Sequence, residues 1–166
     1  MMAFVPTAKR WYLSGVGHLA CGQPVLLIFL RIWFGYGFFK AGLGKLQNIE
    51  TTAGYFGDLG IPLPEINAWM AGTTECLGGI LLFLGVGSRV VAIPLILTML
   101  VAYSTQHFDE FHTLWTVKSG AGYNPAPFFK AAPFNYLLTS LLVLFFGPGD
   151  FSIDGIIKSY LDRSRK

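Results

Sequence analysis

Charged residues are scarce in this sequence. Asp, Glu, Lys and Arg together make up 13% of its 166 residues, whereas hydrophobic residues make up 53%. The mean hydropathy of +0.53 is too high for an ordinary soluble domain of this length. The formal charge of +3 suggests nucleic-acid binding, but the basic residues lie at the ends of apolar runs and form no stripe. We therefore expect a membrane protein that contacts the lipid bilayer and has no nucleic-acid partner.

Cysteine is scarce as well. Cys21 and Cys76 lie far apart and form no CxxC pair. This spacing excludes a thioredoxin-like motif, a four-thiolate iron–sulfur cluster and a cysteine zinc site within this chain. The residues before Cys21 include glycine, serine and histidine, which make a poor signal-peptide core, so we expect the N-terminal segment to be retained.

Motifs for familiar cofactors are absent. The sequence contains no GxGxxG, P-loop or GxSxG, so nicotinamide, nucleotide and serine-hydrolase chemistry have no support. His107 and His112 are not spaced to share a helical face as metal ligands. Only His107 lies near a predicted membrane span, so a bis-histidine haem site has no second ligand. We expect no metal site and no intrinsic cofactor, and we assign no catalytic residue.

Four apolar segments are each close to the ~20 residues that a helix needs to cross a membrane. Strands are excluded because an open sheet edge is not tolerated in lipid and the segments show no alternation of apolar and polar residues. We predict an all-α, integral membrane four-helix bundle in a single domain over residues 1–166. The predicted helices cover roughly residues 23–45, 64–85, 89–107 and 128–147.

The basic residues predict the orientation of this bundle. More of them lie on the side of the termini than on the opposite side, so the positive-inside rule puts both termini in the cytoplasm and the protein in the inner (plasma) membrane. Those on the side of the termini are Lys9, Arg10, Arg89, Lys158, Arg163, Arg165 and Lys166, against Lys45, Lys118 and Lys130.

The C-terminal tail over residues 152–163 is amphipathic. Its apolar residues recur at the spacing of one helical face, and Lys and Arg cluster at its end. The apolar positions are Ile153, Ile156, Ile157, Tyr160 and Leu161. We predict a short amphipathic helix on the cytoplasmic membrane surface.

Ionisable residues inside the predicted spans are the candidate site. One face of the first helix carries two cations, two glycines and a phenylalanine: Arg31, Gly35, Phe38, Gly42 and Lys45. On the second helix, Glu75 has small neighbours that let another helix approach closely, among them Gly78 and Gly79. We predict an Arg31–Glu75 ion pair that can extend to Lys45.

Two interpretations of this ion pair are open. An unpaired charge in a membrane span costs several kcal/mol, so pairing is nearly forced and can serve only to lock two helices together. Charges inside membranes are commonly functional, which favours a pair that also lines a ligand or proton site. Tyr103 and His107, at the outer end of the third helix, complete the set of candidate ligand-binding residues.

Several motifs in register resemble the DoxX family of small four-helix membrane proteins. The first helix reads R-x3-G-x2-F-x3-G-x2-K-L from Arg31, and the later motifs are LGIPLP at 59–64, ECLGG at 75–79, LGVGSR at 84–89 and FGPGDFSID at 146–154. The resemblance covers roughly residues 26–154. The family residues that it carries over to this chain are Arg31, Lys45, Glu75 and Arg89.

The resemblance implies a function. The family takes its name from membrane subunits of a thiosulfate–quinone oxidoreductase, and other members are linked to thiol and quinone stress. This implies a membrane subunit of a quinone-linked oxidoreductase system that works with other protein subunits or further copies of itself. Aromatic residues would then hold a quinone ring, and Arg31, Glu75 and Lys45 would bind one of its oxygens.

The alternative is a non-enzymatic protein. In that hypothesis the chain is a membrane assembly or anchoring module, or a small-solute binding or transport protein, and the ion pair is purely structural. The second outer loop, residues 107–133, is polar and unusually aromatic, departs from the compact family pattern, and is a candidate docking surface.

Overall fold

The computed structural model describes residues 22–116 and 123–164, and every regular element within these ranges is a helix. The predicted all-α class is therefore confirmed for the described part of the chain. Two helices are long and apolar enough to cross a membrane, α2 (Gln23–Gln47) and α5 (Ser88–Thr105). The helix α4 (Pro64–Leu84) is also long, whereas the apolar helix α8 (Ala132–Phe146) has only 15 residues.

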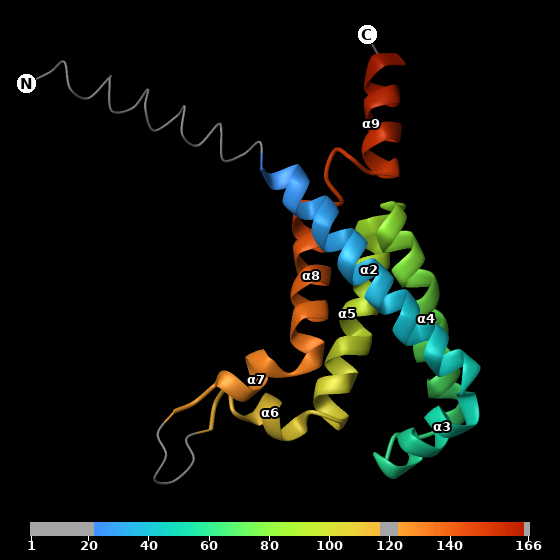
Figure 1. Ribbon diagram of the computed structural model, residues 1–166, viewed down its shortest axis with the longest axis vertical. Helices are drawn as coiled ribbons and strands as arrows, with labels where there is room; N and C mark the ends of the chain where they lie inside the picture. The colour runs from blue at the N-terminus through green and yellow to red at the C-terminus, as the bar shows by residue number, and fades with distance from the viewer. Residues whose placement is uncertain (1–21, 117–122, 165–166) are drawn as a thin grey trace, which may run out of the picture.

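The helices α2, α4, α5 and α8 pack in a ring, so that each contacts two of the others. Helix α2 lies against α4, α4 against α5, α5 against α8, and α8 against α2. The ribbon shows them gathered near the turn between α4 and α5, which we call the narrow end; at the opposite, wide end the pair α2 and α4 diverges from the pair α5 and α8 (Figure 1). The shorter helices at the wide end are α3 (Ile49–Asp58), α6 (Phe108–His112) and α7 (Ala126–Lys130).

Two predicted segments differ from the structure. The connection after the first predicted helix contains α3, which follows α2 almost directly. The predicted helix over residues 128–147 is divided into α7 and α8, because Ala131 adopts an extended conformation (φ −63°, ψ 140°). Pro133 lies in the first turn of α8, where its missing N–H costs nothing and its fixed φ suits the start of a new helix.

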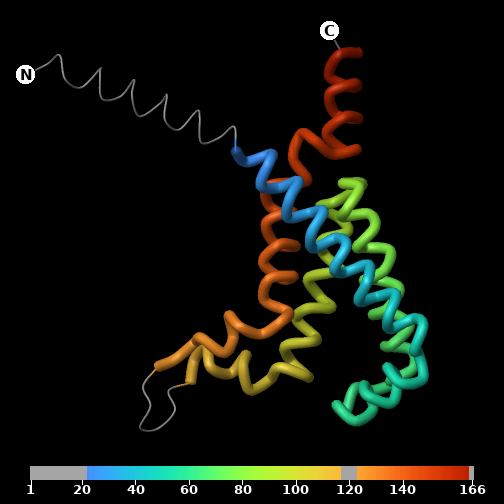
Figure 2. The backbone as a smooth tube through the Cα atoms, in the orientation of Figure 1, coloured from blue at the N-terminus to red at the C-terminus, as the bar shows by residue number. Residues whose placement is uncertain are grey.

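Backbone contact between α2 and α4 depends on glycine. A Cβ added to Gly42 would collide with the backbones of Cys76 and Gly72, and one added to Gly35 would lie 2.8 Å from the Phe83 backbone nitrogen. We call this contact the glycine seam. It places α2 diagonally across α4 (Figure 2) and sets which residues of the two helices lie side by side.

Glycine also makes the turn at the narrow end. Helix α4 ends at Gly85 with φ 73°, and α5 begins after Gly87 with φ 55°. Both angles lie in the left-handed region, which glycine adopts without a steric penalty. The short turn makes α4 and α5 antiparallel neighbours at this end only.

Two clusters form the core. One contains Phe38, Leu82, Leu95, Met99 and Val143 and joins the four long helices. In the other, the chain around Phe128 folds back on α5: Tyr103 is fully buried, stacks on Phe128 at 4.7 Å and donates its hydroxyl to the Phe128 carbonyl at 2.9 Å. Within the described part of the predicted docking loop, four residues belong to this cluster, Phe111, Leu114, Phe128 and Ala131, whereas Phe108, Trp115, Tyr123 and Phe129 are exposed.

The predicted C-terminal helix is present as α9 (Ile153–Ser164). It extends away from the narrow end, has no buried residue, and exposes Ile156 and Tyr160 (Figure 1). Its placement on a membrane surface stays a prediction. The sequence-based arguments on Cys21 and on five of the basic residues, Lys9, Arg10, Lys118, Arg165 and Lys166, concern positions outside the described residues.

Candidate ligand cavity at the wide end

A partly buried ion pair joins α2 to α4. The Lys45 ammonium donates a hydrogen bond to Glu75 Oε2. The Glu75 side chain is 5% exposed and that of Lys45 is 28% exposed, so the carboxylate is in the interior and the ammonium lies nearer the surface. The pair lies close to the glycine seam, since Gly42 contacts Cys76, the residue after Glu75.

The predicted Arg31–Glu75 pair is wrong. Arg31 and Lys45 are about 21 Å apart along α2 at the usual rise of an α-helix. Arg31 lies instead beside Gly85, at the opposite end of α4 from where that helix begins. The glycine seam sets the register of α4 along α2 so that Glu75 approaches Lys45 and not Arg31.

Arg31 binds backbone carbonyls at the narrow end. Its guanidinium donates to the carbonyl of Pro148 at 2.5 Å and to that of Phe151 at 3.0 Å. The Asp154 carboxylate accepts hydrogen bonds from the backbone N–H groups of Gly87 at 2.9 Å and Ser88 at 3.1 Å, which caps the start of α5. The segment after α8 therefore ties the ends of α2, α4 and α5 together, and we call this arrangement the clasp.

Arg89 lies next to the clasp. Its guanidinium is 3.5 Å from the Phe145 carbonyl and close to Gly147, where α8 ends. The two arginines carried over by the family resemblance thus both contact the end of α8 or the chain just after it. Gly78 and Gly79 of α4 face different helices. A Cβ at Gly78 would lie 2.9 Å from Leu95 of α5, whereas Gly79 faces α2 and belongs to the glycine seam.

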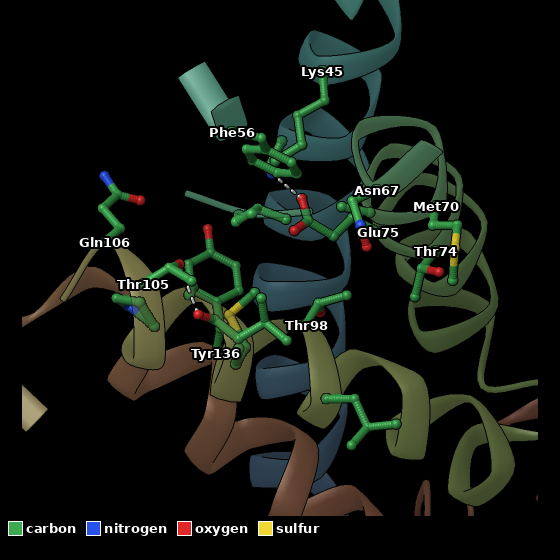
Figure 3. A pocket seen from close by; sticks show the side chains of 18 of the residues that line it. Lys45, Phe56, Asn67, Met70, Thr74, Glu75, Thr98, Thr105, Gln106 and Tyr136 are labelled. Atoms are coloured by element: carbon green, nitrogen blue, oxygen red, sulfur yellow. Dashed lines mark hydrogen bonds and ion pairs between the residues drawn. The ribbon is translucent and has the colours of Figure 1, made fainter. Parts of the chain in front are cut away.

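A cavity of about 460 Å³ lies at the wide end, with walls from α2, α3, α4, α5 and α8. Most of its lining is apolar. The polar lining residues include Lys45, Asn67, Glu75, Thr98, His107 and Tyr136. Figure 3 shows the Lys45–Glu75 pair at this cavity, with Tyr136 on the side of α8. A cavity of this size suits a small organic ligand.

The structure brings three of the predicted ligand-binding residues to the cavity, Lys45, Glu75 and His107. Arg31 lies in the clasp, and Tyr103 is enclosed by its packing against Phe128 and does not line the cavity. His107 Nδ1 is 3.5 Å from Glu110 Oε1, in the first turn of α6. Among the described residues, no group of three or more His, Cys, Asp or Glu side chains is arranged to hold a metal ion.

Tyr136 is a cavity residue that sequence reasoning missed. Its ring packs edge-on against Phe34 at 5.2 Å and Phe38 at 4.8 Å, and its hydroxyl lies against Gly37. A side chain at residue 37 would collide with that hydroxyl. The signal was a tyrosine in the middle of an apolar helix, where its hydroxyl needs a polar partner or a cavity.

The arrangement can hold a flat ligand that carries a polar oxygen. The ammonium of Lys45 has three N–H donors, and one is bound to Glu75. The remaining donors can bind a carbonyl or anionic oxygen, and Glu75 can take up or release a proton beside it. Aromatic rings on the wall, such as those of Phe38, Phe56 and Tyr136, offer contact to a ring.

Fold and site together define a class: a protein that is helical throughout its described elements, with long apolar helices and a partly buried ion pair at a ligand-sized cavity. The chain belongs to the DoxX family, whose family model matches residues 25–108. The match includes α2 from its third residue onward and all of α3, α4 and α5, and with them both members of the ion pair.

Relatives extend this similarity over most of the chain. A Bacillus subtilis (strain 168) protein named "Putative oxidoreductase CatD" is 33% identical over 132 residues, which are 78% of this chain and 85% of the relative. "Inner membrane protein YphA" of Escherichia coli (strain K12) is 31% identical over 133 residues, 80% of this chain and 90% of the relative. "Uncharacterized membrane protein Rv3486" of Mycobacterium tuberculosis (strain ATCC 25618 / H37Rv) is 28% identical over 140 residues, 79% and 80% of the two chains. No solved structure matches the chain significantly.

Proposed function

We propose that this protein is a multi-pass protein of the inner (plasma) membrane, in which α2, α4, α5 and α8 cross the bilayer as a four-helix bundle with both termini cytoplasmic. Large apolar side chains on the outward faces of these helices support the proposal, among them Trp33 (65% exposed), Val90 (72%) and Phe145 (71%). The names of two relatives describe membrane proteins, one of them an inner membrane protein. The narrow end, which carries Arg89 and leads into α9, would face the cytoplasm.

Within that membrane, we propose that the protein is a subunit of a quinone-linked oxidoreductase system of the thiosulfate or thiol type. The observation that carries this proposal is the Lys45–Glu75 pair on the wall of a largely apolar, ligand-sized cavity. The word oxidoreductase in the name of the Bacillus relative supports it as an analogy. Other protein subunits, or further copies of this chain, would complete the system.

The residues of the cavity fit a quinone. A quinone ring is flat and apolar with a carbonyl oxygen at each of two positions, so it needs an apolar slot and hydrogen-bond donors. Phe38 and Phe56 provide aromatic surface, Lys45 has donors to spare, and Tyr136 adds a hydroxyl on another helix. When bound, a quinone would supply acceptor chemistry for two electrons and two protons, with the electrons coming from a partner subunit that oxidises thiosulfate or a thiol.

The chain's own residues would bind, orient and exchange protons. Lys45 would hold a ring oxygen and stabilise negative charge on it, because a positive charge in a site of low dielectric constant interacts strongly with such charge. Glu75, bonded to Lys45, would hold a proton for that oxygen or accept one from it. The apolar wall would orient the ring and exclude water.

Lipid extraction tests this proposal. Protein purified in mild detergent should copurify with quinone, detected in the extracted lipid by its absorption and mass. The Glu75→Gln variant should retain about a tenth or less of it, since the change weakens a charge-assisted hydrogen bond at the site. Glu50→Gln, an exposed carboxylate outside the cavity, is the matched control and should retain the wild-type amount. Repeated absence of quinone from the wild-type protein would contradict the proposal.

A second candidate function is a non-enzymatic module for membrane assembly, anchoring, or small-solute binding or transport. The position of the Lys45–Glu75 pair beside the glycine seam favours it, because a pair in that position locks α2 to α4 whether or not a ligand binds. Wild-type protein without quinone, together with Glu75→Gln protein that is less stable but leaves quinol turnover in membranes unchanged, would support this function.

A further inference from the structure

The cavity reaches the outside along the flank of the helix assembly. Three of its lining residues are apolar and largely exposed: Met70 (60%), Leu97 (57%) and Val101 (52%). A side chain that lines a cavity and is also exposed lies at the rim of an opening. Met70 belongs to α4 and the other two to α5, so this rim follows the line between these helices.

The geometry of α4 and α5 explains the opening. The two helices are joined by the short turn from Gly85 to Gly87 and pack closely near it, where Gly78 lies against Leu95. Cavity-lining residues on α5 run from Pro94 to Thr105, about 17 Å along the helix axis. We call the opening between Met70 of α4 and Leu97 and Val101 of α5 the slot.

The other sides of the cavity also have exposed lining residues, among them Ala41 on α2 and Gln106 after α5, but none of these is a large aliphatic side chain. On the flank between α2 and α8, the Tyr136 ring contacts both Phe34 and Phe38 and bridges the two helices. At the wide end, α3 and the chain after it cover the cavity with Tyr55, Phe56, Leu59 and Ile61. Within the described ranges, no pair of aromatic rings joins α4 to α5 in this way.

We infer that the ligand enters sideways from the hydrocarbon of the membrane, through the slot between α4 and α5, and is a lipid-borne molecule with a polar ring and an apolar tail. The inference rests on the proposed membrane location and ring-binding site. An apolar tail passes the rim of Met70, Leu97 and Val101 without a desolvation cost, whereas a charged or strongly polar solute would lose its hydration there. The ring contacts Lys45 and Glu75, and the tail lies in the slot.

The rate of association tests this route. Protein in nanodiscs of phosphatidylcholine and phosphatidylglycerol is mixed with radiolabelled decyl-benzoquinone or with unsubstituted benzoquinone, and bound label is collected by rapid filtration against empty nanodiscs. Leu97→Trp should slow association of the decyl compound about tenfold or more, a change within the range seen among variants of one binding site. Met70→Trp, on the other side of the slot, should do the same.

Control variants separate this route from the others. Leu100→Trp is on α5 and exposed but does not line the cavity, and it should bind the decyl compound at the wild-type rate. Ala41→Trp obstructs the flank between α2 and α8, and Gln106→Trp obstructs the wide end; both residues line the cavity and are exposed. Neither should slow the decyl compound as strongly as Leu97→Trp.

The outcomes distinguish this inference from the proposed function. Wild-type protein that binds both compounds, but is slowed by Ala41→Trp or Gln106→Trp and not by Leu97→Trp or Met70→Trp, would overturn the lateral route and leave the quinone site standing. Wild-type protein that binds neither compound would overturn the proposed function and this inference with it.

Discussion

The narrow end and the wide end each contain a buried or partly buried cation from α2, but the two cations have different partners. At the narrow end, Arg31 is 3% exposed and donates to carbonyls of the segment after α8. At the wide end, the Lys45 side chain is 28% exposed, pairs with Glu75 and borders the cavity. Helix α2 thus carries one cation, Arg31, that binds the segment after α8, and another, Lys45, that has donors free for a ligand.

The chemistry of the two side chains matches this difference. A guanidinium is planar and presents five N–H donors in a fixed arrangement, so it can bind carbonyls on either side of a bend in the chain, as Arg31 does in the clasp. An ammonium is compact, and its stem is flexible, so Lys45 can shift between Glu75 and another acceptor. The comparison indicates that burial of charge alone does not identify a ligand site. A charged side chain marks a ligand site when its bonding partner leaves it free donors and a cavity lies beside it.

The largest effect on stability is expected from Arg31→Met. The change leaves the carbonyls of Pro148 and Phe151 without their side-chain donor and releases the clasp, which should cost about 3 kcal/mol of unfolding free energy. Thermal unfolding in detergent measures it. Lys40→Met removes an exposed cation from the same helix and should leave the melting temperature nearly unchanged. Equal melting temperatures for the two variants would show that the clasp does not stabilise the narrow end.

The next effect is expected from Gly42→Ala at the glycine seam, which fixes the register of α2 on α4 and therefore which cation of α2 meets Glu75. The added methyl group collides with backbone atoms that cannot move without parting the helices, so the cost should be about 2 kcal/mol. Gly44→Ala is the matched control on the same helix, because a Cβ there meets no atom within 4 Å. It should stabilise the helix by up to about 1 kcal/mol. A similar response at both positions would contradict the seam.

The smallest effect is a difference between two double-mutant cycles. Arg31 and Glu75 lie at different ends, so Arg31→Met and Glu75→Gln should add within about 0.5 kcal/mol. Lys45 and Glu75 are in contact, so Lys45→Met and Glu75→Gln should deviate from additivity by about 1 kcal/mol. Unfolding in detergent with each single and double variant measures both. Coupling in the first cycle and additivity in the second would restore the pairing predicted from the sequence.

Local sequence properties were sufficient for the helical class and for the burial of Glu75. Apolar segments of membrane-spanning length predicted most of α2, α4 and α5, and small neighbours predicted that Glu75 faces another helix. The helical class and the burial of Glu75 both depend on residues close together in the sequence, so periodicity and composition were enough to predict them.

Local sequence properties could not predict which groups the charged side chains contact. Which cation meets Glu75 depends on how far α4 slides along α2, and that shift is set by backbone contact at the glycine seam. Asp154 caps α5, which begins at residue 88, so the capping residue is not next to the helix start in the sequence and a local capping motif could not predict it. Tyr136 reaches the cavity only because α8 packs beside α2.

The central claim is that Lys45 and Glu75 face a ligand while the clasp is structural, and one measurement tests it most directly. Affinity for decyl-benzoquinone in nanodiscs is compared between Lys45→Met and Asp154→Asn, a mild change in the clasp that keeps the side-chain shape. Loss of the ammonium should weaken binding about tenfold or more, since hydrogen bonds to charged groups contribute about 1.5–3 kcal/mol. Asp154→Asn should change the affinity by less than about twofold, a difference of under about 0.5 kcal/mol. Unchanged affinity in Lys45→Met, or an equal loss in both variants, would contradict the claim.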